Sequence, residues 1–384
     1  MRTKTKATVG LATAGALALA LSVTIPAYAD YQPGPSDVVG VGGDTPQYAL
    51  QFLTDGSATA VDGYNTAGNS YKVVNFNATA DANGRAAYAQ GSTETSPALL
   101  NPTDVLRAGT TPIQRTQSSG DAIKALLADT GSTETINYVA SASQPTAAQQ
   151  TAAANAGWGF LHVVQFATDS VQVAAASTTN APAGLSAAEL LGIYTGTYKH
   201  WNDLPGNSSG STDAIIPELP ASTSSVYKTF IGALTTANGG STPTLATSVV
   251  TVEQNDPSAV TGAATPADAI VPFTAGRLNL WNSSYFHNPA TVFPGGTALS
   301  AGIKLLSGTT PDAAAAYSST IKYYVIFRNS DASDAAWQPG GTKNWVNTLF
   351  VGSSPFIKSG SGQADIAAAG LTYSYSDLGN VSSG

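Results

Sequence analysis

Hydroxyl-rich loops in front of predicted helices carry the most promising chemistry in this sequence. Four loops share this composition: Asp44-Thr45, Ser118-Ser119, Ser141 with Ser143, and Ser222–Ser225. A serine or threonine at such a position commonly caps the helix by accepting a backbone hydrogen bond. Helix N-termini with unpaired N–H groups also attract anions. The loops therefore predict helix caps, an anion-binding cradle, or both.

Arg115 lies three residues before Ser118. A guanidinium group holds a carboxylate or an oxyanion with two parallel hydrogen bonds. Two interpretations stay open at this point. Arg115 binds the ligand or fixes a loop carboxylate, or it is a structural or surface arginine.

Other catalytic or metal-binding arrangements find little support. The stretch "GNSSG", residues 206–210, has the spacing of a nucleophile elbow, but no apolar strand leads into it. His162, His200 and His287 are far apart in the sequence, which argues against a zinc site. Cysteine is absent, which excludes disulfides, thiol catalysis and cysteine-ligated metals. We expect no enzymatic activity, no metal and no cofactor.

The charge balance argues against nucleic-acid binding. The chain has 16 Lys and Arg against 24 Asp and Glu, and 10% of its residues are charged. A nucleic-acid-binding protein needs a basic footprint that this balance does not supply. An anionic ligand is compatible with it, because backbone N–H groups hold an anion without formal positive charge.

The first 29 residues have the pattern of a secretory signal peptide. Arg2, Lys4 and Lys6 precede an Ala-, Leu- and Val-rich run, and Ala27-Tyr28-Ala29 fits a small-x-small cleavage site. No cysteine follows for lipid attachment, and removal of the leader would lower the net charge from −8 to −11. We expect the remaining chain to be secreted and soluble. It is long enough for two lobes.

Strands alternate with helices after the leader, which predicts an α/β protein with mixed, mainly parallel sheets flanked by helices. The expected strands cover residues 38–41, 71–78, 136–140, 268–281 and 321–329. The expected helices begin near Pro46, Ser119 and Pro145 and also cover residues 185–196, 225–234, 342–357 and 362–373. Residues 159–177 hold two short apolar segments, which predict a crossover between lobes.

Five segments resemble the PstS-like phosphate-binding family of the periplasmic-binding-protein superfamily, in its actinobacterial secreted form. They are "DVVGVGGDTPQYAL", "QRTQSSGDAIKALLAD", "INYVASASQP", "LSAAELLGIYTGTYKHWNDLPG" and "IIPELPASTSSVYKTF". The fourth is the most specific, because a helix followed by Tyr-x-Gly and Trp-Asn-Asp is a hallmark of the family. The resemblance covers nearly all of the chain after the leader. It implies a two-lobed, Venus-flytrap fold that closes on an oxyanion and delivers it to an ABC importer.

The resemblance assigns ligand binding to six residues: Thr45, Arg115, Ser118, Ser119, Ser141 and Ser224. Two positions depart from the family. Next to Ser141 stands Ala142, where the family has an acidic residue that accepts the proton of hydrogen phosphate. Residues 223–227 read Thr-Ser-Ser-Val-Tyr, where the family has Gly-Ser-Gly-Thr-Arg. Loss of charge-assisted hydrogen bonds worth roughly 1.5–3 kcal/mol each predicts weaker phosphate binding than is usual, or another ligand.

Together these observations predict a secreted, monomeric solute-binding protein that captures a small anion such as phosphate, with an ABC transporter permease as partner. Lobe 1 would comprise residues 30–170 and 288–384, and lobe 2 residues 171–287. The missing lipid anchor and the altered fourth loop leave open an extracellular interaction protein on the same fold, with a different ligand or none. A hydrolase is a third alternative that only "GNSSG" supports.

Overall fold

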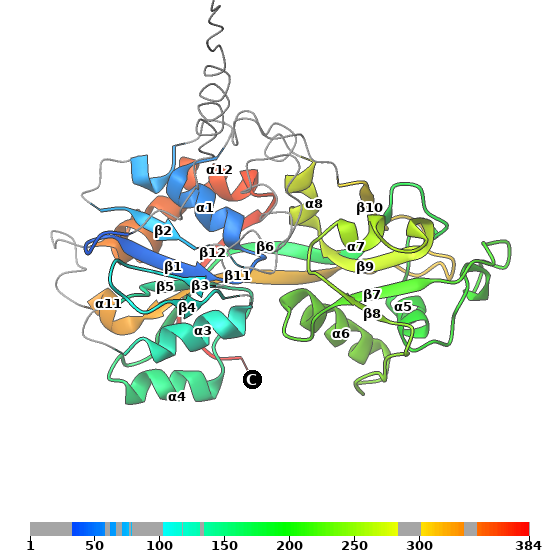
Figure 1. Ribbon diagram of the computed structural model, residues 1–384, viewed down its shortest axis with the longest axis horizontal. Helices are drawn as coiled ribbons and strands as arrows, with labels where there is room; N and C mark the ends of the chain where they lie inside the picture. The colour runs from blue at the N-terminus through cyan, green and yellow to red at the C-terminus, as the bar shows by residue number, and fades with distance from the viewer. Residues whose placement is uncertain are drawn as a thin grey trace, which may run out of the picture. The chain divides into compact units, whose positions relative to one another are not determined.

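The computed structural model contains a ten-stranded mixed β-sheet with helices on both faces (Figure 1). It describes residues 33–57, 62–66, 71–76, 78, 103–116, 118–130, 134–282, 301–333 and 344–383. The predicted leader and His287 lie outside these described residues.

Eight strands of the sheet follow the order β2-β1-β5-β11-β6-β9-β7-β8, and β10 and β12 pair with β6 outside this order. The ten strands are β1 (Val38–Gly42), β2 (Val73–Asn75), β5 (Tyr138–Ser141), β6 (Leu161–Ala176), β7 (Ile216–Pro220), β8 (Val250–Val252), β9 (Ala269–Thr274), β10 (Ile303–Leu305), β11 (Ser319–Arg328) and β12 (Thr372–Asn380). A separate two-stranded sheet consists of β3 (Thr103–Asp104) and β4 (Ile113–Gln114).

Two parallel sections of the sheet are joined by long antiparallel strands. β2, β1 and β5 are parallel, and so are β9, β7 and β8. β6 pairs antiparallel with β11 along most of its length and with β9 along its last part. Figure 1 shows β6 and β11 passing through the middle of the sheet. The predicted α/β class with mixed sheets is confirmed, and the predicted crossover is one continuous strand, β6.

Helices cover both faces of each section. They are α1 (Gln47–Asp55), α3 (Ser119–Ala128), α4 (Ala147–Asn155), α5 (Ala187–Tyr194), α6 (Ser225–Ala237), α7 (Ser258–Thr261), α8 (Ala275–Trp281), α11 (Asn329–Ser333) and α12 (Gly360–Ala368). The helix predicted over residues 342–357 is instead a π-helical segment, Val346–Val351, followed by a 3₁₀ turn at Phe356–Lys358. Among the described residues, no helix is long and apolar enough to span a membrane.

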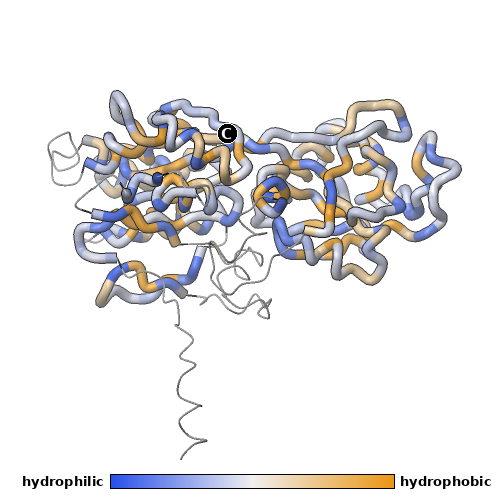
Figure 2. The backbone as a smooth tube through the Cα atoms, turned by 90° about the horizontal axis from the view of Figure 1, so that it is seen from above, coloured by the Kyte–Doolittle hydropathy of each residue, from blue (hydrophilic) through white to orange (hydrophobic). Residues whose placement is uncertain are grey.

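Side chains of β1 alternate between two hydrophobic cores. Val38 packs in a core with Tyr48 of α1, whereas Val39 packs in another with Ile123 of α3. Figure 2 shows hydrophobic and hydrophilic residues interspersed along the backbone. Because both faces of β1 are covered, the strand is apolar throughout. Polar chemistry is therefore confined to its two ends.

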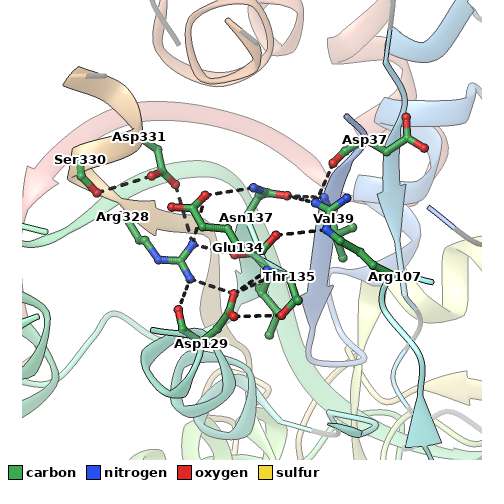
Figure 3. Close-up of polar contacts among 11 residues, drawn as sticks. Asp37, Val39, Arg107, Asp129, Glu134, Thr135, Asn137, Arg328, Ser330 and Asp331 are labelled. Atoms are coloured by element: carbon green, nitrogen blue, oxygen red, sulfur yellow. Dashed lines mark hydrogen bonds and ion pairs between the residues drawn. The ribbon is translucent and has the colours of Figure 1, made fainter. Parts of the chain in front are cut away.

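At the amino-terminal end of β1, the buried side chain of Arg107 binds main-chain oxygens (Figure 3). Its Nη1 donates to the carbonyl of Gly34 at 2.7 Å and its Nη2 to that of Asp37 at 2.8 Å. Nη2 also donates to Oδ1 of Asn137 at 3.0 Å, and that oxygen accepts the N–H of Val39 at 2.8 Å. Arg107 thus fixes the start of β1 against the segment that leads into β5.

A second buried arginine, Arg328 at the end of β11, holds the adjacent loop. It donates to the carbonyls of Ile136 at 2.7 Å and Asp129 at 2.8 Å, and to the Asp129 carboxylate at 3.0 Å. Glu134 and Asp331 lie 3.8 and 4.0 Å from its Nη1. Burial and the neighbouring Glu134 carboxylate raise the pKa of Asp331. Arg328 therefore forms ion pairs with several carboxylates at this end of the sheet.

Candidate functional site

A cavity of about 320 Å³ lies where several parallel strands end. Its lining comes from the segments that follow β1, β7 and β8 and from the N-termini of α3 and α6. Ligands of open α/β sheets bind at the carboxyl ends of the strands. Four of the six residues predicted to bind ligand line this cavity: Thr45, Ser118, Ser119 and Ser224.

The loop after β1 brings Thr45 to the cavity. A Cβ on Gly43 would lie 3.2 Å from the backbone nitrogen of Ser119, so this loop passes close to the start of α3. Thr45 Oγ1 lies 3.4 Å from Oγ of Ser225, the first residue of α6. The predicted cap at Asp44-Thr45 is wrong. Pro46 is the N-cap of α1 and makes no side-chain cap bond, and Asp44 is one of the residues that line the cavity.

Ser118 and Ser119 occupy the start of α3. Ser118 is the N-cap: its Oγ accepts the N–H of Asp121 at 3.3 Å and donates to the Asp121 carboxylate at 2.8 Å. Ser119 Oγ accepts the N–H of Ala142 at 2.8 Å. The capping interpretation is confirmed for Ser118. A hydroxyl that accepts one hydrogen bond still has a proton to donate, and Ser119 is in that position.

Ser224 caps α6, and Gln254 covers the same helix end. Ser224 Oγ accepts the N–H of Tyr227 at 3.1 Å and donates to Oε1 of Gln254. The same oxygen accepts the N–H of Val226 at 3.2 Å. Gln254 thus holds two donors of the helix terminus that an anion would otherwise use.

Asp44 is a buried carboxyl group in the lining of this cavity. Gln254 Nε2 donates to its Oδ1, and Arg277 Nη2 donates to its backbone oxygen at 2.8 Å. Among the described residues, Oδ2 of Asp44 has no hydrogen-bond partner. Burial raises the pKa of Asp44, while Arg277 and the Gln254 hydrogen bond act in the opposite direction. The cavity therefore contains an acidic group with unused hydrogen-bonding capacity.

Sequence reasoning missed Asp44, Gln254 and Arg277 as site residues. Asp44 was assigned to helix capping, and Gln254 follows β8, a three-residue strand that the sequence did not reveal. Arg277 was expected in a strand over residues 268–281. That prediction is wrong beyond Thr274, because β9 ends there and α8 begins at Ala275. The turn into α8 brings Arg277 to Asp44, with its guanidinium 4.6 Å from the ring centroid of Tyr48.

The other two predicted site residues lie outside the lining of this cavity. Ser141 is fully buried; its Oγ donates to the carbonyl of Ser143 at 2.5 Å and accepts the Ser143 N–H at 3.0 Å. Arg115 is buried against Asp104, with Nη2 2.6 Å from Oδ1, and lines a different cavity of about 850 Å³ beside α3. Asp104 lies on β3, so Arg115 fixes a carboxylate of the neighbouring small sheet.

The remaining sequence motifs form no recognisable centre. Ser208 and Ser209 of "GNSSG" are exposed in turns that follow the 3₁₀ segment Trp201–Asp203. His162 and His200 bind the carboxylates of Asp377 and Asp203 separately. In the described part of the chain, no group of three or more His, Cys, Asp or Glu is placed to hold a metal ion.

Residues 77–347 match the family model of the PBP superfamily domain. The chain belongs to this family. None of the curated protein sequences compared with it is significantly similar.

The chain is also similar to solved structures. One from Clostridium perfringens, assigned as a phosphate ABC transporter substrate-binding protein and containing phosphate, has a TM-score of 0.51 at 10% identity, covering 88% of this chain and 100% of that one. An ABC-type phosphate transport receptor from Vibrio cholerae has a TM-score of 0.48 at 13% identity, with coverages of 88% and 100%. The predicted membership of the periplasmic-binding-protein superfamily is confirmed by the family model, and the Clostridium perfringens structure shares the fold.

Proposed function

We propose that this protein is a solute-binding protein that captures a small oxyanion, with phosphate as the leading candidate, in the cavity lined by Thr45, Ser119 and Asp44. The observation that carries the proposal is the buried Asp44 carboxyl, whose Oδ2 has no partner among the described residues and which lies beside hydroxyl donors. A buried polar atom without a partner is costly. A ligand with both donor and acceptor oxygens would satisfy it.

Hydrogen phosphate fits the mixed chemistry of this lining. Its unprotonated oxygens would accept hydrogen bonds from the hydroxyls of Thr45 and Ser119 and from helix N-termini. The hydroxyls of Ser118 and Ser224 already donate to Asp121 and Gln254, so these two residues would line the site without donating to the ligand. Its hydroxyl group donates to the Asp44 carboxylate. Asp44 would then supply the acidic acceptor that is absent beside Ser141. Arg115 and Ser141 would act indirectly, Arg115 by fixing Asp104 and Ser141 by shaping the loop whose Ala142 N–H binds Ser119.

The affinity should be modest for such a fold. Among the described residues, the cavity lining contains no lysine or arginine, and the nearby Arg277 donates to the backbone oxygen of Asp44. Gln254 occupies donors at the start of α6 that a bound anion needs. The ligand must displace Gln254 or bind with fewer donors, and either alternative lowers affinity.

Capture would involve closure of two lobes about the long strands. Lobe 1 would hold residues 30–170 and 288–384 and lobe 2 residues 171–287, with β6 and β11 as the connection. Hinge closure around a ligand is a common motion of such proteins. The proposal includes export by the leader of residues 1–29, a monomeric state and delivery to an ABC transporter permease.

A second candidate function is an extracellular interaction protein whose cavity binds a neutral, sugar-like ligand. The observation in its favour is the lining itself, which presents hydroxyl and amide groups such as Thr45, Ser119 and Gln254 without a cationic side chain among the described residues. A sugar offers hydroxyls that both donate and accept hydrogen bonds, as this lining does.

Isothermal calorimetry of the purified protein with phosphate tests the proposal. We expect saturable binding that Ser119→Ala weakens by roughly 1 kcal/mol, the usual contribution of one hydrogen bond. Ser208→Ala, at an exposed serine outside the cavity, is the matched control and should bind as the wild type does. No heat at millimolar phosphate would exclude phosphate as the ligand, and binding of a neutral sugar instead would favour the second candidate.

Arg115→Ala separates a role in binding from a structural one. If Arg115 supports the ligand loops through Asp104, its loss should weaken phosphate binding at least about tenfold. Unchanged affinity in a folded variant would make Arg115 purely structural.

A further inference from the structure

A third cavity, of about 700 Å³, lies between the β7–β8 edge of the sheet and α7. Apolar side chains form much of its lining: Ile216, Val250 and Val252 from the strands, and Ala259 and Ala263 in and after α7. All of its lining residues belong to the described part of the chain. β8 is the last strand in the sheet order, so the cavity borders an edge strand.

Glu218 belongs to the lining of this cavity. The residue lies in the middle of β7, opposite Val250 of β8, and only 3% of it is exposed. Among the described residues, its Oε2 has no hydrogen-bond partner. The nearby hydroxyl of Tyr194 donates at 2.9 Å to the backbone oxygen of Glu218. Burial raises the pKa of Glu218 to about 7.

The charges around the cavity all have the same sign. Glu253 and Asp256 belong to its lining, and among the described residues no lysine, arginine or histidine does. The Asp256 carboxylate accepts the N–H of Ser258 at 2.8 Å. A buried carboxylate needs a donor or a positive charge to offset its desolvation, and the described protein supplies neither for Oε2 of Glu218.

We propose that this cavity is a second ligand site, which binds a small organic ammonium ion with an apolar chain. The ammonium group would donate to Glu218 Oε2, and the chain would pack against Val250, Val252 and Ala259. Ammonium is a strong donor to a carboxylate, and the aliphatic lining suits a hydrocarbon chain. The site is independent of the proposed oxyanion cavity, although Val252 and Glu253 line both.

A divalent metal ion fits this cavity less well than an organic cation. Such ions need several oxygen ligands around one point, and the carboxylates here do not form a metal-binding group within the described residues. The valine and alanine side chains also have no polar group that could bind a hydrated ion. The combination of one buried acid and an aliphatic wall is what selects an alkylammonium ligand.

Titration with n-pentylammonium chloride, followed by calorimetry, tests the proposal. We expect saturable binding that Glu218→Gln weakens at least about tenfold, as loss of a charge-assisted bond does. The neutral isostere 1-pentanol should bind at least about tenfold more weakly to the wild type. Asp213→Asn removes a carboxylate at an exposed residue outside the cavity and should leave binding unchanged.

Ala259→Leu provides an independent variant, since it fills the cavity from partly exposed α7 and keeps Glu218. It should abolish pentylammonium binding. If Glu218→Gln fails to fold, this variant still tests whether pentylammonium binds in the cavity. Phosphate binding should be unchanged in both variants, so failure of this proposal is distinguishable from failure of the oxyanion proposal. Absence of pentylammonium binding at millimolar concentration, equal binding of 1-pentanol, or equal binding by Glu218→Gln would overturn it.

Discussion

The polar residues at the two ends of β1 and β5 differ in how they use their hydrogen-bonding groups. At the amino-terminal end, Arg107 and Arg328 donate to several backbone and carboxylate oxygens at once (Figure 3). At the carboxyl-terminal end, hydroxyls gather around the buried Asp44, one oxygen of which has no partner among the described residues. The first end uses its guanidinium groups for internal bonds, and the second retains capacity for a ligand.

This difference bears on the proposed anion site, whose lining contains no arginine among the described residues. The four arginines in the described residues, Arg107, Arg115, Arg277 and Arg328, are all buried. Each makes a hydrogen bond or an ion pair with an oxygen of the protein itself. Among the described residues, neutral donors and helix termini are therefore what the proposed ligand could use, which suits modest affinity.

We expect the largest effect, a loss of stability, from a substitution at the amino-terminal end of β1 and β5, where the arginines lie. Arg328→Met leaves the Asp129 carboxylate without its ion-pair partner and the carbonyl of Ile136 without its donor. Breaking a buried ion pair from one side costs about 3–5 kcal/mol. Urea unfolding should show that the free energy of unfolding falls by this amount. For the control Lys124→Met, at an exposed lysine of α3, it should stay within about 0.5 kcal/mol of the wild type. A loss below about 1 kcal/mol for Arg328→Met would contradict the assigned role.

At the cavity end, Asp44→Asn should change ligand selectivity more than stability. A carboxylate acceptor favours hydrogen phosphate, which has a proton to donate, over sulfate, which has none at neutral pH. The asparagine amide can donate to either anion. We expect the ratio of phosphate to sulfate affinity, measured by calorimetry, to fall about tenfold or more, in line with one charge-assisted bond. Asp213→Asn serves as control, and an unchanged ratio in Asp44→Asn would remove Asp44 from the site.

Gln254→Ala should produce a smaller change in the opposite direction. Removal of its amide frees the hydroxyl of Ser224 and the N–H of Val226 for an anion. We expect phosphate affinity to increase about fivefold, equivalent to about 1 kcal/mol. Weaker binding would show that Gln254 itself contacts the ligand.

A pH-dependent effect concerns Asp169, which lies on β6 between the two parallel sections. It accepts the N–H groups of Gly276 at 2.9 Å and Ser170 at 2.7 Å, yet burial raises its pKa to about 6. The folded protein thus holds this proton to a higher pH than the unfolded chain, whose aspartate pKa is about 3.9. The stability contributed by Asp169 therefore falls as pH rises from about 4 to 6. Between these pH values the urea midpoint of the wild type should fall relative to that of Asp169→Asn. If the midpoints of the two proteins changed with pH in parallel, the raised pKa of Asp169 would be contradicted.

Local signals in the sequence identified most of the elements that position the cavity. The apolar run at β1 and the hydroxyls at Ser118 and Ser224 located a strand and two helix starts correctly. These features depend on neighbouring residues, through burial of a short strand and capping of a helix. The convergence of Thr45, Ser118, Ser119 and Ser224 followed from the rule that parallel strands end at one edge.

Features set by distant contacts could not be predicted in this way. β12 consists largely of small and polar residues and exists because it pairs with β6, far away in the sequence. Arg277 reaches Asp44 across more than two hundred residues. Gln254 lies in a polar loop with no local pattern that distinguishes it from other surface amides. Tertiary contacts decide these positions, so a single sequence offers no signal for them.

A crystal structure of the protein soaked in phosphate tests the central claim most directly, because it shows where the anion lies. The account predicts a tetrahedral ion in the cavity at the carboxyl ends of the strands. Its oxygens should lie within hydrogen-bond distance of Thr45, Ser119 and Asp44. Phosphate bound elsewhere, with only water in this cavity, would contradict the assignment of this edge as the ligand site.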